Sequence, residues 1–338
     1  MNAHYKQLKE GGIKMKRRHL IGIVLFLFVT ATVLAVSGSP VRAEFPEKPI
    51  TLIVPWSPGG SGDMTCRILG AQMEKELGKP VVVKNMPGAG SIVGAKALAD
   101  AKADGYTLGF LGISAAIAQY TSVSPVMMSE YTAVSGIINP SLFLLVNAKT
   151  PWKTIPEFVA YAKANPGKIK NGNAGAGVID HLYSSDFAKV ANVNFTQVPY
   201  KGWGPSLAAL AGGHVNSMFV AIGPAKAMIG AGKIRPVAIA ADERHPSYPD
   251  IPTMKEGGVD ITMPFWESIV VPDGTPGDVI AILNKAIHKA FQDPGTLKKI
   301  KDSGLDVSYM DTKGIAKLRA DSNAQVKEMV ESLGLNQK

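Results

Sequence analysis

Cysteine is almost absent from this chain, which has 338 residues and a single cysteine at position 66. One cysteine excludes an intramolecular disulfide, so the fold must be held together by its hydrophobic core. No histidine lies near Cys66 in the sequence, and there is no second cysteine to resolve an oxidised thiol. We therefore expect Cys66 to be a packed, inert thiol rather than a nucleophile.

The sequence also lacks the motifs of several common enzyme classes. It has no GxGxxG after the first predicted strand, no Walker A string, no GxSxG elbow and no HExxH. Outside the N-terminal segment the histidines are scattered without metal-ligand spacing; they are His181, His214, His245 and His288. We therefore expect no metal, no cofactor and no catalytic residue.

An excess of positive charge is confined to the N-terminus. The formal net charge of the whole chain is +9, but residues 1–43 hold seven Lys or Arg and one acid, which leaves +3 for the remainder. No basic run with interleaved aromatics follows, so nothing predicts a nucleic-acid partner. A slightly positive surface suits small anionic ligands.

The N-terminal segment has the pattern of a secretory signal peptide. Basic residues at 14–18 precede the apolar run Leu20–Val36, and Ala43 supplies the small residue that a cleavage site needs. We expect residues 1–43 to be cleaved and the mature chain to be exported. The alternative is an uncleaved membrane anchor, and Met1 and Met15 are both candidate starts.

The most informative local pattern follows the first predicted strand. Ile50–Val54 is a short apolar, β-branched run, and prolines and four small residues at 55–62 separate it from a periodic stretch at 64–77. A glycine turn from a strand into a helix leaves backbone N–H groups pointing into open space, where the helix dipole adds to them. This turn is therefore predicted to favour an anion.

Strand and helix patterns alternate along the mature chain, which predicts an α/β protein with largely parallel sheets. We expect two lobes joined by crossings near 147–152 and 263–272, with residues 44–147 and 265–338 in lobe 1 and residues 148–264 in lobe 2. A strand at Leu142–Asn147 is assigned to lobe 1. Two crossings leave a cleft between the lobes, and such clefts are favoured ligand sites.

Four side chains near the first glycine turn have a structural or a ligand-binding interpretation. Asp63 and Arg67 are four residues apart, hence on one helical face, and we favour a structural ion pair over a direct ligand clamp by Arg67. Asp63 is alternatively a contact for a ligand hydroxyl or ammonium group. Ser61 is expected to cap the helix or to donate to a ligand, and Trp56 to flank one.

Two further glycine loops carry the same pattern. The loop at 85–91 lies between a predicted strand and helix, where plain turn chemistry is the competing explanation. The loop at 171–177 precedes a helix that carries His181. Helix starts in both lobes, facing across a cleft, would hold a ligand with an acidic group at each end.

Six strings in this order resemble one family, the extracytoplasmic solute receptors of tripartite tricarboxylate transporters, often called the Bug family. They cover the mature chain and are FPEKPITLIVPWSPGGSGD (45–63), KNMPGAGSIVGAKALADAKADGYTL (84–108), GNAGAGVIDHL (172–182), VPYKGWGPSLAALAGGHV (198–215), AGKIRPVAIA (231–240) and FWESIVVPDGTPGDVI (265–280). The resemblance implies a type II-like periplasmic binding protein fold, with two α/β lobes that close on a small carboxylate.

The resemblance also implies a set of ligand-binding positions. They are Trp56, Gly59, Gly60, Ser61, Asp63, Ser114, Ala174, Gly175, Ala176, Gly177, Val178, His181, Tyr200 and Asn216. Two of them depart from the family pattern. Val178 stands where many members have Thr or Ser, and Asn216 stands where many have Asp.

These observations lead to one functional hypothesis and two alternatives. The hypothesis is a periplasmic, non-enzymatic binding protein, a monomer by family expectation, that delivers a small di- or tricarboxylate to the permease subunits of a tripartite tricarboxylate transporter. Aromatic acids and amino acids stay open as ligands. The alternatives are a sensory protein that presents a ligand to a two-component receptor, and an exported hydrolytic enzyme.

Overall fold

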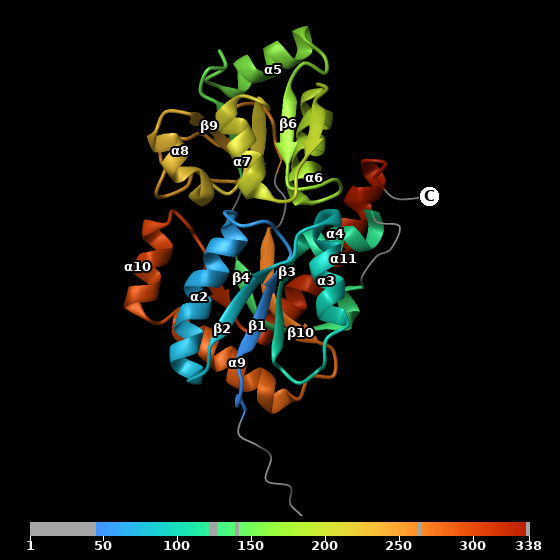
Figure 1. Cartoon of the computed structure of the whole chain (residues 1–338). Coiled ribbons are helices and arrows are strands. Elements are labelled where there is room, and N and C mark those ends of the chain that lie inside the picture. Colours follow the sequence, from blue (N-terminus) through green and yellow to red (C-terminus); the bar gives the residue numbers. More distant parts are fainter. Residues whose placement is uncertain (1–44, 122–126, 139–141, 262–264, 336–338) are drawn as a thin grey trace, which may run out of the picture. The chain divides into compact units, whose positions relative to one another are not determined.

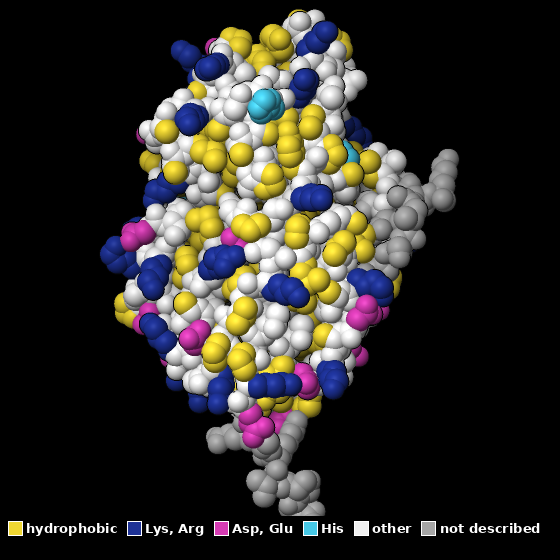
Figure 2. Space-filling model, in the orientation of Figure 1, with side chains coloured by type: hydrophobic (Ala, Val, Ile, Leu, Met, Phe, Trp, Pro, Cys, Tyr) yellow, Lys and Arg dark blue, Asp and Glu magenta, His cyan; other side chains and the backbone are white. Residues whose placement is uncertain are grey.

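Two β-sheets organise the chain in the computed structural model, which describes residues 45–121, 127–138, 142–261 and 265–335 (Figure 1). From Pro46 onward the chain forms one unit. The predicted signal peptide lies outside the described residues. Among the helices that the structure describes, none is long and apolar enough to cross a membrane. On the face shown in Figure 2, basic and acidic side chains are interspersed rather than gathered by sign.

The first sheet has six strands in the order β11-β4-β10-β3-β1-β2. Its strands are β1 (Ile50–Val54), β2 (Val81–Asn85), β3 (Thr107–Gly112), β4 (Tyr131–Ile138), β10 (Trp266–Pro272) and β11 (Ser308–Met310). The same lobe contains α2 (Ser61–Leu77), η1 (Ala89–Ser91), α3 (Ile92–Ala99), α4 (Ile113–Thr121), η2 (Met128–Glu130), α9 (Gly277–Ala290), α10 (Pro294–Asp302) and α11 (Thr312–Ser332). The C-terminal helices pack on α2 and β4.

The second sheet has five strands in the order β7-β6-β8-β5-β9. Its strands are β5 (Phe143–Asn147), β6 (Lys170–Asn173), β7 (Thr196–Pro199), β8 (Ser217–Val220) and β9 (Ile234–Ile239). The helices of this lobe are α5 (Ile155–Ala164), α6 (Ile179–Ala191), α7 (Trp203–Gly212), η3 (Gly223–Ala225) and α8 (Lys226–Gly230). A hydrophobic cluster built around this sheet extends through Phe265 and Trp266 to α11.

Two expectations about the sheets are wrong. Strand β5, which we assigned to the first lobe, hydrogen-bonds to β8 and β9 in the second sheet. The sheets are also mixed rather than largely parallel, because β10 runs antiparallel to β3 and β4, and β5 runs antiparallel to both of its neighbours.

Both corrections have one physical cause. Strands β1 and β3 run parallel and end at the turns that line the pocket described below, whereas β10 starts there with Trp266 and Glu267. A strand that follows a crossing from the other lobe begins at the end of the sheet that faces that lobe. It must therefore run away from that lobe. The directions of β5, which follows β4 of the first sheet, and of β10, which follows β9 of the second sheet, fit this rule.

The single cysteine of the chain is part of the hydrophobic core. Cys66 lies on α2 with no exposed surface, as expected, and burial raises the pKa of this thiol well above its ordinary value. A buried thiol of raised pKa is a poor nucleophile. Cys66 is thus a packing residue in the helix whose first turn reaches the pocket.

Candidate ligand-binding pocket

The first wall of the pocket is the turn from β1 into α2. Gly59 has a φ of +90°, a conformation that side chains disfavour, and Gly60 precedes the helix with no side-chain cap. Ser61 is therefore the first helical residue and not the cap that we predicted, and it lines the cavity. The first-turn amides of α2 lack a side-chain cap, which favours an anionic ligand group there.

Asp63 is held in a network of partners. Its Oδ1 atom lies 2.9 Å from Arg67 Nη2, which confirms the predicted ion pair, and it accepts a 2.9 Å hydrogen bond from Asn85. Its Oδ2 atom accepts from the Gly59 N–H at 3.1 Å, and Asn85 also donates to the Trp56 carbonyl. Burial alone would raise the pKa of Asp63, but the bonds from Arg67, Asn85 and Gly59 outweigh it and lower the pKa.

The second wall comes from the loop between β6 and α6. Asp180, in the first turn of α6, accepts hydrogen bonds at Oδ2 from the Ala174 N–H (2.8 Å) and from Trp203 Nε1 (3.0 Å). Its side chain is fully buried, and Oδ1 has no hydrogen-bond partner among the described residues. Burial raises the pKa of Asp180 to about 7 despite these hydrogen bonds.

Backbone amides of this loop donate hydrogen bonds to side chains of the flanking strand and helix. The Gly175 N–H donates to Asn173 Oδ1, and the Gly177 N–H donates to His181 Nδ1 at 2.9 Å. Burial lowers the pKa of His181, which fits a neutral ring that accepts this bond. The loop therefore offers fewer open N–H groups to a ligand than its glycine content suggested.

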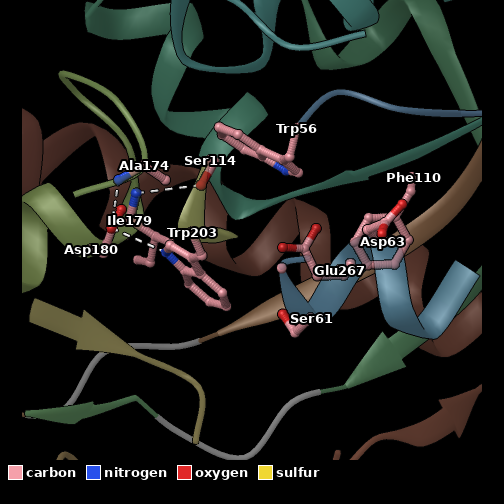
Figure 3. A pocket seen from close by; sticks show the side chains of 12 residues that line it. Trp56, Ser61, Asp63, Phe110, Ser114, Ala174, Ile179, Asp180, Trp203 and Glu267 are labelled. Atoms are coloured by element: carbon pink, nitrogen blue, oxygen red, sulfur yellow. Dashed lines mark hydrogen bonds between the residues drawn. The ribbon is translucent and has the colours of Figure 1, made fainter. Parts of the chain in front are cut away.

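Residues of both lobes meet around one cavity with an empty volume of about 400 Å³, its open mouth included (Figure 3). Around it, Ser114 of α4 accepts a 3.3 Å hydrogen bond from the Ile179 N–H, and the Ser57 N–H donates to the Lys201 carbonyl at 3.0 Å. These bonds tie the lobes together. The lining residues are Trp56, Gly60, Ser61, Gly62, Asp63, Phe110, Ser114, Ala174, Ile179, Asp180, Trp203 and Glu267.

Glu267 is the acid nearest the middle of the side chains drawn in Figure 3. It is 8% exposed, and burial raises the pKa of its carboxyl to about 8. Its cross-strand neighbour is Gly112, and a Cβ atom there would collide with Glu267 Oε2. The missing side chain at Gly112 therefore makes room for the carboxyl group.

Several predicted site residues lie outside this lining. The second glycine loop contacts the third, since Gly90 packs against Val178 and Gly175, so these loops form an interlobe contact beside the cavity. The predicted positions absent from the lining are Gly59, Gly175, Ala176, Gly177, Val178, His181, Tyr200 and Asn216. Among these, Gly59 and His181 support the walls through the hydrogen bonds given above.

The structure places Asn216, one of the predicted ligand-binding positions, away from the pocket. It pairs with Lys170, the first residue of β6, through hydrogen bonds in both directions. Ala174 of the pocket follows the last residue of the same strand. Asn216 thus lies at the end of the strand opposite to the pocket and fixes the start of two strands.

The lining also contains six residues beyond the individually predicted positions. Four of them belong to segments that the sequence places at the cleft, namely Gly62, Ile179, Asp180 and Trp203, whereas Phe110 and Glu267 were missed altogether. Two of the six carry a signal that could have found them. Asp180 occupies the first turn of a helix after a glycine loop, as Asp63 does. Glu267 is a lone acid in an apolar run, and an acid in such a place needs a reason to be buried.

A group of three His, Cys, Asp or Glu side chains able to hold a metal ion is absent from the part of the chain that the structure describes. Two α/β lobes around a shared cavity define a two-lobed binding protein, and solved structures of this class match closely. The periplasmic binding protein BugD matches with a TM-score of 0.82 at 27% identity, over 87% of this chain and 100% of that one.

The chain belongs to the family described as the tripartite tricarboxylate transporter family receptor, which matches residues 65–335. A relative from Cupriavidus necator, the UPF0065 protein in the gbd 5' region, is 35% identical over 95% of this chain and 99% of its own. These findings confirm the resemblance and the two-lobed fold. The family is one of solute-binding receptors.

Two solved relatives contain organic acids. MatC from Rhodopseudomonas palustris, with bound malate, has a TM-score of 0.78 at 28% identity and covers 85% of this chain and 100% of its own. A second R. palustris protein, with adipate, has a TM-score of 0.80 at 25% identity and covers 86% of this chain and 99% of its own.

Proposed function

We propose that this protein captures a small organic carboxylate in the periplasm and delivers it to the permease subunits of a tripartite tricarboxylate transporter. The observation that carries the proposal is the cavity lined by both lobes, with the uncapped first turn of α2 on one side. Family membership and the malate and adipate in two solved relatives support the ligand class. Cleavage after residue 43 would release the mature chain.

Capture needs no covalent chemistry. A ligand that contacts both lobes binds the closed form better than the open form and so shifts the population toward closure. The bonds from Ile179 to Ser114 and from Ser57 to Lys201 are of the kind that form only when the lobes meet. They would stabilise closure together with the ligand.

The residues of a hydrolytic enzyme are not assembled in this pocket. His181 Nδ1 accepts from the Gly177 N–H, and Ser61 has no histidine partner among the described residues. Asp63 is engaged with Arg67 and Asn85. No specific observation favours catalysis over binding.

The first test is a thermal-unfolding titration of the mature chain, refolded to remove carried-over ligand, against a panel of organic acids. A site-bound acid at a hundred times its dissociation constant adds about 2.7 kcal/mol to the free energy of unfolding. Trp56 and Trp203 line the pocket, so binding should also change the tryptophan fluorescence. A panel that leaves both signals unchanged would contradict the proposal.

Delivery needs a separate experiment. Uptake of the identified acid by cells or vesicles that contain the permease subunits should depend on added binding protein. If the acid binds but uptake is unaffected, capture stands and the transport role fails in favour of a sensory one.

A further inference from the structure

The lining of the pocket is acidic, which is unexpected for a carboxylate receptor. It contains three carboxyl side chains, on Asp63, Asp180 and Glu267, and no Lys, Arg or His among the described residues. Asp63 is neutralised by Arg67 at 2.9 Å. The other two carboxyl groups have no cationic partner among the described residues.

Burial makes the lack of a partner costly. Asp180 is fully buried with Oδ1 unpartnered, and Glu267 is 8% exposed with no hydrogen bond to its carboxyl among the described residues. A buried carboxylate without a counter-charge is unfavourable unless something pairs with it. A cationic group on a bound molecule would remove that cost at both residues.

The anionic half of the site lies elsewhere in the same cavity. Ser61 and Gly62 begin α2 behind an uncapped Gly60, so their backbone amides attract a carboxylate. Gly112, on the neighbouring strand, leaves room for the Glu267 carboxyl beside it. The cavity thus offers one region for an anion and another for a cation.

We propose that the ligand of this protein is an amino-substituted carboxylic acid, whose ammonium group pairs with Glu267 in the field of Asp180 while its carboxylate meets the start of α2. This inference rests on the proposed function and specifies its ligand. A di- or tricarboxylate without a cationic group supplies no counter-charge to these acids, so it would bind only with Glu267 protonated.

The test uses pairs of dicarboxylic acids with the same carbon chain, one member with an ammonium group and one without. Malate and aspartate carry a hydroxyl and an ammonium on the same carbon, and adipate and 2-aminoadipate differ by the ammonium alone. Calorimetric titration of the refolded mature chain should find the amino member of at least one pair bound about tenfold tighter or more, as expected for a charged hydrogen bond. Equal or tighter binding of the plain acid would overturn the inference.

Substitution assigns the preference to its residue. Glu267→Gln keeps the shape of the side chain and should reduce the preference for the amino member to about onefold. The matched control is Glu243→Gln, which changes the net charge equally at an exposed position and should leave the ratio unaltered. An unchanged ratio in Glu267→Gln would contradict the role of Glu267, and thermal unfolding checks that the variant is folded.

The pH dependence supplies a second readout. An ammonium favours the ionised form of Glu267, whose pKa is about 8 without ligand, so amino-acid affinity should rise between pH 6 and pH 8. The surrounding groups are Asp63 with Arg67 and the Cys66 thiol on α2, and Asp180 on α6. A plain acid should show the opposite slope, because its binding to a protonated Glu267 takes up a proton. An amino acid whose affinity falls with pH would contradict the pairing.

Failure of the inference is distinguishable from failure of the proposed function. Plain acids that bind without any preference for the amino member would leave the carboxylate receptor intact and overturn the inference alone. No binding by either member of any pair would contradict both. Butane-1,4-diamine, a cation without a carboxylate, should bind more weakly than the amino acids, and stronger binding would also contradict both.

Discussion

Asp63 and Asp180 occupy similar places with opposite electrostatics. Each lies in the first turn of a helix that follows a glycine loop, and each accepts a hydrogen bond from an amide of that loop, Gly59 or Ala174. The pKa of Asp63 is lowered, whereas that of Asp180 is raised to about 7. Asp180 is more deeply buried than Asp63, and Arg67 has no counterpart beside Asp180 among the described residues. The shared local motif therefore does not determine whether the carboxyl group is ionised, because burial and charged partners come from the surrounding structure.

Glu267→Gln should have the largest effect on the ligand-free protein. Its folded pKa of about 8 lies above the ordinary value of 4.5, so the stability tied to this group is present below pH 4.5 and is lost as pH rises toward 8. The substitution removes that loss and should stabilise the protein by on the order of 3 kcal/mol at pH 8. Urea unfolding at pH 5 and pH 8 measures it, and an equal gain at both values would contradict the account.

Asp63→Asn should act in the other direction. It removes the charge that pairs with Arg67 and weakens the hold on Gly59 and Asn85. We expect a loss of about 2 kcal/mol at neutral pH, moderated because the Arg67 side chain is half exposed. The folded pKa of Asp63 is lowered, so the loss should shrink as pH falls below the ordinary value of 3.8. Unfolding curves of both proteins at neutral pH and below pH 3.8 measure this loss of stability. A variant as stable as the native protein at neutral pH would contradict the stabilising role of the Asp63 hydrogen bonds.

Asp180→Asn should have the smallest effect and a sign opposite to Asp63→Asn. The amide oxygen still accepts from the Ala174 N–H and from Trp203, and an uncompensated buried charge is removed. The folded pKa of about 7 lies above the ordinary value of 3.8, so a gain of about 1 kcal/mol is expected above pH 7, and this gain should shrink as pH falls toward 3.8. Side-by-side denaturation of the two Asn variants at pH 8 tests this contrast, and equal losses in both would remove it.

What could be predicted from the sequence was local. The strand at Ile50–Val54, the glycine turn and the Asp63–Arg67 pair depend on residues within twenty positions of one another, and all three are found in the structure. Helical spacing alone places Asp63 and Arg67 on one face. The two lobes, the Ser61 turn and the loop that ends beside Ala174 were expected from the residue pattern, and the family resemblance added the pocket position Ser114.

What could not be predicted depends on strand direction and on contacts between distant segments. Glu267 reaches the pocket because β10 starts at the cleft, and the expectation of parallel sheets hid that edge. Asn216 was misplaced because a short string does not tell which end of a strand it occupies. The engagement of the Gly175 and Gly177 amides with neighbouring side chains was equally invisible in a string of glycines.

The most direct test of the central claim is a calorimetric titration of the refolded mature chain with organic acids, paired with small-angle scattering of the same samples. We expect saturable one-to-one binding of at least one carboxylate class. The bound protein should have a smaller radius of gyration, because the lobes close on the ligand. Heats of dilution alone across the panel, with an unchanged radius, would contradict capture of a carboxylate between the two lobes.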